Sequence, residues 1–303
     1  MGLDILVYTK KYYLRSRFYN MNRVVSLIIC FFAAININAQ EHKHEISVSP
    51  GGGISTLNYK LSEGYSYDEL GVCYSFGYTY SFNKYWGLNT GLEYAFYSAN
   101  MRSNDDYYSG QDVKIQNTLY EFRVICDDYA EIQKATYLNI PVMAQFQIGH
   151  KHKLYLLSGI KTGIPLSANY SNSWKSLKTY RYNLSVPSQN PVFIEYQEGL
   201  SNGKLKMGIL LSLSFEINAK WKLSDRMALS LGTYLDYGIN DIYSGDRNKS
   251  LFRYNNENEP VNNNIFASHY PNGGIEQKSF TEKVSTLATG IKLRLFFGIL
   301  NKQ

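Results

Sequence analysis

The strongest constraint on the fold is a strict alternation of apolar residues with small or polar residues, which recurs in eight segments of the chain. One segment reads VCYSFGYTYSF and another reads LLSLSFEIN. A period of two residues places every second side chain on the same face of a β-strand. The sequence therefore predicts an all-β chain with strands at residues 46–58, 71–82, 86–97, 137–148, 154–166, 207–221, 227–239 and 287–297.

The lengths of these segments and of the connections between them favour a membrane barrel. Strands of soluble proteins usually have five or six residues, whereas crossing a bilayer at a tilt takes about 9–11. The connections alternate between short turns, such as 83–85, and long loops, such as 99–133. Because lipid cannot satisfy an open sheet edge, such a sheet must close. We predict a closed antiparallel up-and-down transmembrane β-barrel of eight strands, with short periplasmic turns and long extracellular loops.

Composition excludes two other classes of protein. A mean hydropathy of −0.31 excludes a bundle of membrane helices. The formal charge of +6 arises mainly from five basic residues before residue 39, and residues 40–303 carry 26 basic and 24 acidic residues. That balance lacks the clustered basic face of a nucleic-acid-binding protein, so we expect no nucleic-acid partner.

The N-terminal region has the pattern of an export signal. The apolar run 24–35 follows Arg23 and is too short to span a bilayer as a helix. Ala39 and Gln40 form the expected cleavage site, and Met21 is the expected initiator. We therefore predict an N-terminal extension plus secretory signal peptide over residues 1–39 and the barrel domain over residues 40–303. The alternative is a buried helix, but polar sequence on both sides of the run gives it no amphipathic continuation.

The same alternation assigns side chains to the lumen and to the lipid. Charges of both signs have the inward parity, where they can pair. We expect an interior charge network of Glu93, Lys161, Glu216, Asp236, Lys292 and Arg294. Outward-facing aromatic residues near the short turns are typical of an interfacial girdle. We expect this girdle to contain Phe82, Trp86, Phe146, Trp221 and Phe297.

Two structural alternatives remain open at this point. The long loops contain further alternating runs, which could extend the strands above the membrane as ribbons. Alternatively, a hairpin at 177–197 could enter the wall and make ten strands. Cys73 and Cys126 could form one disulfide bridge or stay as two thiols.

The signal, the eight strands and the fourth strand together resemble a known family. That strand reads YLNIPVMAQF over residues 137–146, and the hairpin strand at 154–166 follows it with Gly159 and Gly163. These features resemble the outer-membrane β-barrel domain of Bacteroidota that is often described as PorT-like. The resemblance implies an outer-membrane location and, for the member that gives the family its name, a part in protein secretion and gliding.

Catalytic and metal-binding chemistry finds little support in the sequence. Ser268 and His269, with Asp241 or Asp246, form the only combination in a long outer loop that could act as nucleophile and base. His-Lys-His occurs twice, at 42–44 and 150–152, and each pair of imidazoles could hold a metal. We interpret both sites as solvated polar segments, and we predict no catalytic residue, no metal and no cofactor.

These observations lead to a functional hypothesis with two alternatives. We expect a non-enzymatic outer-membrane protein whose extracellular loops contact a protein or glycan, since rings and amides suit such contacts. A rim hydrolase acting on lipid or peptide is the first alternative, and a small pore is the second. The barrel also implies contact with outer-membrane lipids and with the barrel insertion machinery.

Overall fold

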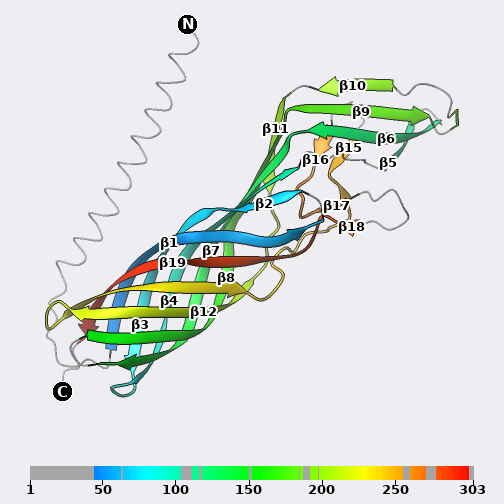
Figure 1. Cartoon of the computed structure of the whole chain (residues 1–303). Helices are drawn as coiled ribbons and strands as arrows, with labels where there is room; N and C mark the ends of the chain where they lie inside the picture. Colours follow the sequence, from blue (N-terminus) through cyan, green and yellow to red (C-terminus); the bar gives the residue numbers. More distant parts are fainter. Residues whose placement is uncertain are drawn as a thin grey trace, which may run out of the picture.

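Eight long strands form a closed barrel in the computed structural model (Figure 1). The structure describes residues 44–299 except 63, 104–110, 116–117, 150–151, 184, 187–191, 197, 255–259 and 271–277. The barrel strands are β1 (His44–Leu61), β3 (Leu70–Ser81), β4 (Trp86–Ser103), β7 (Tyr129–Ile148), β8 (His152–Trp174), β12 (Leu210–Lys222), β13 (Met227–Gly238) and β19 (Thr281–Ile299).

Each of these strands pairs antiparallel with the barrel strands before and after it. The last strand, β19, pairs with the first, β1, in a register that runs from His44 opposite Ile299 to Leu61 opposite Thr281. No edge is therefore left open in the membrane-spanning wall. The prediction of a closed eight-stranded antiparallel barrel is confirmed.

Apolar side chains face outward and polar side chains face inward, as lipid requires. Along β12, Phe215 and Ile217 are 49% and 55% exposed, whereas Ser214 and Glu216 are 0% and 2% exposed. This is the reverse of a soluble protein, whose exposed face is polar. The described residues contain no helix that is long and apolar enough to cross a membrane.

A lipid-facing position on the last strand tests this orientation. Leu293 is 42% exposed and lies opposite Leu231 of β13. We expect Leu293→Arg to destabilise the inserted barrel by about 2–4 kcal/mol, because an arginine at mid-depth of the bilayer must be desolvated. Refolding into lipid vesicles, followed by the heat-dependent shift in gel mobility, measures the folded fraction. Lys283→Arg is the control, since residue 283 lies above the apolar band; equal yields for both variants would contradict the orientation.

The long connections form structure beyond the barrel. Strands β6 (Thr118–Asp127) and β9 (Ser176–Asn183) pair with each other, and β5 (Gln111–Ile115) and β10 (Val192–Tyr196) flank them. Figure 1 shows this four-stranded sheet at the end of the barrel away from the short turns. The ten-strand alternative is therefore wrong: the 177–197 hairpin lies in this sheet, and β8 pairs directly with β12, which leaves no gap in the wall.

Shorter strands complete the extracellular side. β2 (Tyr65–Asp68) pairs with the upper part of β4, and β11 (Gly199–Lys204) pairs with the upper part of β8. The connection between β13 and β19 contains the remaining short strands. These are β14 (Lys249–Ser250), β15 (Phe252–Tyr254), β16 (Pro260–Asn262), β17 (Ser268–Tyr270) and β18 (Lys278–Ser279).

Candidate functional site

A connected layer of buried charges crosses the lumen. The structure places all six charged residues of the predicted interior network there, each at most 4% exposed. Lys161 Nζ lies 2.8 Å from Glu93 Oε1 and 2.8 Å from Asp236 Oδ2. Lys292 Nζ lies 2.9 Å from Glu93 Oε2 and 2.8 Å from Glu216 Oε1.

Arg294 completes this layer with a bond of 2.7 Å from Nη2 to Glu216 Oε2. Three carboxylates thus meet three cations, and the layer is neutral as a whole. The cavity that Ser47, Glu93 and Arg294 help to line has a volume of about 10 Å³, space for about one water molecule. The layer joins five barrel strands and fills the lumen at its level.

The sequence interpretation missed a separate ion pair, which lies near the periplasmic rim. Lys220 Nζ donates to both carboxylate oxygens of Glu45, at 2.8 and 2.7 Å. The same ammonium lies 3.9 Å from the centroid of the Phe296 ring. The parity that assigns Glu216 to the lumen also assigns Lys220, so the signal was present in the sequence.

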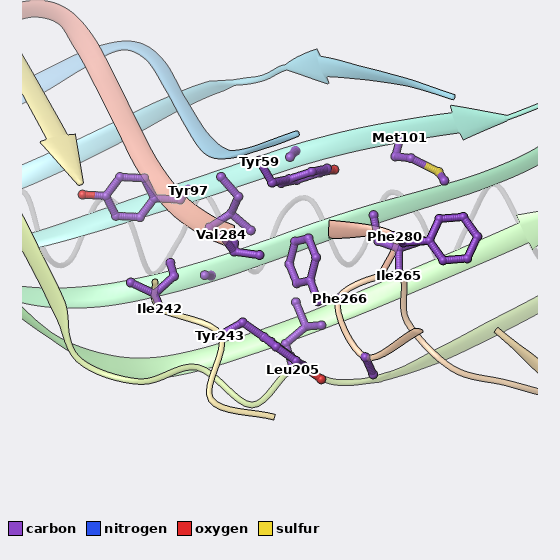
Figure 2. Close-up of a cluster of buried hydrophobic side chains, with 14 of the residues drawn as sticks. Tyr59, Tyr97, Met101, Leu205, Ile242, Tyr243, Ile265, Phe266, Phe280 and Val284 are labelled. Carbon is purple, nitrogen blue, oxygen red and sulfur yellow. The ribbon is translucent and has the colours of Figure 1, made fainter. Parts of the chain in front are cut away.

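Above the charged layer, the lumen is filled by an apolar cluster (Figure 2). We define the upper chamber as the space that is lined by Leu57, Tyr59, Tyr97, Met101 and Tyr137. Side chains from the connection between β13 and β19 fold back into this chamber. They are Ile242, Tyr243, Ile265, Phe266 and Phe280.

Phe266 is the central ring of this cluster. It is fully buried and packs edge-on against Tyr59 and Tyr243, at centroid distances of 5.0 and 5.8 Å. The sequence interpretation placed Ser268 and His269 in a long outer loop between the strands at 227–239 and 287–297 and missed this return into the barrel. The short run Ile265-Phe266-Ala267, with asparagines before it and Ser268 and His269 after it, is the signal that could have indicated it.

A buried carboxylate attaches the returning connection to the wall. Glu131 is 0% exposed and accepts hydrogen bonds from the Tyr129 hydroxyl at 2.7 Å and from Gln133 Nε2 at 2.9 Å. The backbone N–H of Ile265 also donates to this carboxylate, at 3.2 Å. Within the described residues Glu131 forms no ion pair. Burial raises the pKa of Glu131 to about 7, although these hydrogen bonds oppose the rise.

This carboxyl group predicts a pH dependence. The native state binds the proton more tightly than the unfolded chain, where the pKa is near the ordinary value of 4.5. Its stabilising contribution is therefore complete below about pH 4.5 and is lost as the pH rises to about 7. The loss amounts to roughly 3 kcal/mol, at 1.36 kcal/mol per pKa unit.

Glu131→Gln should remove this part of the pH dependence. We expect urea unfolding of the wild type to show a larger loss of stability between pH 4.5 and pH 8 than that of the variant. Glu282→Gln, at an exposed site on β19, is the control. Parallel curves for Glu131→Gln and the wild type would contradict the prediction.

The aromatic residues of the predicted girdle differ in exposure. Phe82, Trp86 and Trp221 are 57%, 50% and 37% exposed, and Trp86 packs against Phe146 at 4.9 Å between centroids. Phe297 differs from the expectation, because it is only 4% exposed. It lies between Ile46 and Met227 on the neighbouring strands, which are themselves only partly exposed. Phe297 therefore offers no open ring to the interface.

The serine and histidine of the hydrolase alternative are not arranged for catalysis. The Ser268 hydroxyl is fully buried and donates to the backbone oxygen of Asn264 at 2.8 Å. Asp241 forms an ion pair with Arg247 at 2.8 Å. Burial lowers the pKa of His269, and its Nδ1 has no partner among the described residues. No described hydrogen bond links the three groups.

The remaining sequence predictions have different outcomes. Ala39 and Gln40 lie outside the described residues, so the cleavage site and the division at residue 39 stay predictions. Cys73 and Cys126 are both buried and free. Of the histidines in the two tripeptides, His44 Nδ1 is 2.6 Å from the Tyr78 hydroxyl. No group of three possible metal ligands occurs among the described residues.

Comparison with known proteins gives the family and three similar structures. The chain is similar to neisserial surface protein A, with 8% identity over 85% of this chain and 97% of that one, at a TM-score of 0.34. OprG from Pseudomonas aeruginosa has 12% identity over 87% and 100%, at 0.32. Ail of Yersinia pestis has 12% identity over 84% and 98%, at 0.29.

No curated protein matches the chain. Residues 38–244 match the family described as outer membrane protein beta-barrel domain, which is more than half of the sequence. The protein therefore belongs to this family of outer-membrane β-barrels, and it lies in the bacterial outer membrane.

Proposed function

We propose that this protein is a non-enzymatic, non-conducting barrel that binds a protein or glycan at the cell surface. The binding element is the extracellular cap, which we define as the sheet of β5, β6, β9 and β10 together with residues 239–280. The observation that carries the proposal is this sheet, which the chain builds beyond the membrane wall. In the described structure its outer strands, β5 and β10, each pair on one side only.

A strand that is paired on one side presents backbone donors and acceptors to a partner. The blocked lumen supports the same proposal, because a charged layer and an apolar cluster occupy the space that a pore would need. The hydrolase alternative lacks support, because the Ser268 hydroxyl and the Asp241 carboxylate are engaged elsewhere.

Complementation of a deletion strain tests the proposal. We expect a variant in which a short turn replaces residues 176–198 to fold as a barrel but to fail to restore the phenotype. His269→Ala should restore it. Neither the wild type nor the trimmed protein should give stable conductance steps in planar bilayers. Loss of function from His269→Ala alone would support the hydrolase, and reproducible channel steps would support the pore.

The resemblance to PorT-like proteins suggests one class of partner. If the cap binds a component of a secretion or gliding machine, the deletion strain should retain proteins that it normally secretes. The trimmed variant should show the same defect. Normal secretion in both strains would exclude this role and leave surface binding as the function.

A further inference from the structure

The lipid-facing wall carries a cluster of basic side chains, apart from the cap that the proposed function uses. Arg102 on β4, Lys134 on β7 and Lys204 on β11 are all exposed. Lys134 and Lys204 both lie opposite Asn169 of β8 in the sheet register, so the three side chains form one row across β7, β8 and β11. We call Arg102, Lys134, Asn169 and Lys204 the basic patch; Arg102 lies above the row, opposite Ala130, which is four residues from Lys134 along β7.

All four residues of the patch have the outward parity. On β7, residues on the other parity, such as Glu131 and Gln133, are fully buried, whereas Lys134 is exposed. On β8, Asn172 is buried and Asn169 is exposed. The patch therefore lies on the outer wall of the barrel and not in the upper chamber.

The depth of the patch corresponds to the outer headgroup layer. On β4, Phe96 is the last outward aromatic residue and is 36% exposed. The next outward position, Ser98, lies opposite Lys134. The basic row therefore begins one residue pair above the apolar band, where charged headgroups meet the barrel wall.

The charge of this surface is unbalanced. Among the outward positions above the apolar band on β4, β7, β8 and β11, none of the described residues is acidic, and the exposed Asp68 of β2 lies opposite Ala99 of β4, on the other parity from Arg102. Arg102, Lys134 and Lys204 form no ion pair with a described residue. The exposed amide side chain of Asn169, with serines beside it, supplies further hydrogen-bonding groups. On the opposite wall, the exposed Lys283 of β19 follows the exposed Glu282, so charges of both signs occur there.

We propose that the basic patch binds the phosphorylated glycolipid of the outer leaflet. Ammonium and guanidinium groups bind its phosphates as charge-assisted partners, and the amides and hydroxyls bind its sugars. The patch continues the lipid-facing surface without interruption, so the ligand is a membrane lipid and not a soluble anion. The lipid would hold β7, β8 and β11 at the point where the wall leaves the membrane.

Native mass spectrometry of the full chain in nanodiscs tests the site. The probe is purified lipid A, compared with enzymatically dephosphorylated lipid A. The test variant is Arg102→Gln, Lys134→Gln and Lys204→Gln together. The control variant, Lys60→Gln, Lys249→Gln and Lys283→Gln, removes the same charge at exposed positions outside the patch. The heat-dependent shift in gel mobility checks that each variant is folded. A variant with Lys134→Arg and Lys204→Arg keeps the positive charge at both positions and is the conservative rescue.

We expect the test variant to retain lipid A roughly 100-fold less tightly than the wild type, since each cation contributes about fivefold. The control and the arginine rescue should stay within a few-fold of the wild type, and dephosphorylated lipid A should bind no better to the wild type than to the test variant. Three results would overturn the proposal: equal loss of lipid A binding in the test and control variants, binding of dephosphorylated lipid A to the wild type as tightly as lipid A itself, or displacement of lipid A by millimolar inorganic phosphate.

Discussion

Lys161→Met is expected to lower the free energy of unfolding by about 3–5 kcal/mol, because it leaves a buried carboxylate without its cation. Lys161 bonds to Glu93 and Asp236 at 2.8 Å each. Glu93 keeps Lys292 as a partner, but Asp236 has no other ion pair among the described residues. Urea unfolding of the barrel in lipid vesicles measures the loss.

The double variant Lys161→Met with Asp236→Asn separates charge pairing from packing. It removes both members of the pair, so no unpaired charge remains, and we expect it to recover most of the stability. If the double variant is as unstable as the single one, the cost comes from the altered packing of residue 161. If the single variant matches the wild type, the charged layer does not stabilise the fold.

Phe266→Ala is expected to weaken the packing of the cap in the upper chamber by about 3–5 kcal/mol, as for other buried phenylalanines. The residue is fully buried between Tyr59 and Tyr243, and alanine would leave a cavity. Hydrogen exchange of residues 264–268 should become faster by at least two orders of magnitude. The barrel strands below the charged layer should keep their protection.

Tyr65→Ala is the matched control for this experiment, since its ring is 75% exposed on β2. We expect no change in exchange at residues 264–268 in that variant. Unchanged exchange in Phe266→Ala would mean that the wall of the upper chamber, and not the returning ring, holds the connection in place.

The membrane-spanning part of the fold could be predicted because lipid imposes one simple pattern. Each wall strand must present apolar groups to lipid, so β3 and β13 were placed within one residue of their bounds, and β4 was placed correctly at its start. The same pattern placed Glu93, Lys161 and their partners on the inward face. What it could not give was which cation meets which carboxylate, since pairing depends on strand register and stagger across the lumen.

Outside the membrane the pattern loses this constraint, and the sequence was less informative. Strands β4, β7 and β8 continue well above the apolar band, where their outward residues include Arg102 and Lys134 and no longer alternate in polarity. β5, β10 and β14 have five residues or fewer, too short for a reliable period. The position of Phe266 depends on contacts with distant strands, and such contacts have no local signature.

Pairing of β1 with β19 has a consequence for how the barrel folds and inserts into the membrane. His44 meets Ile299, so the two ends of the domain must find each other before the wall is continuous. Contacts between residues so distant in sequence form slowly, because a long chain must first be brought into a loop. Until that seam closes, β1 and β19 each present a bare edge that lipid cannot satisfy. The barrel wall can therefore close only after β19 has been exported. A chain that ends before β19 would keep an open sheet edge and would have no stable state in the membrane.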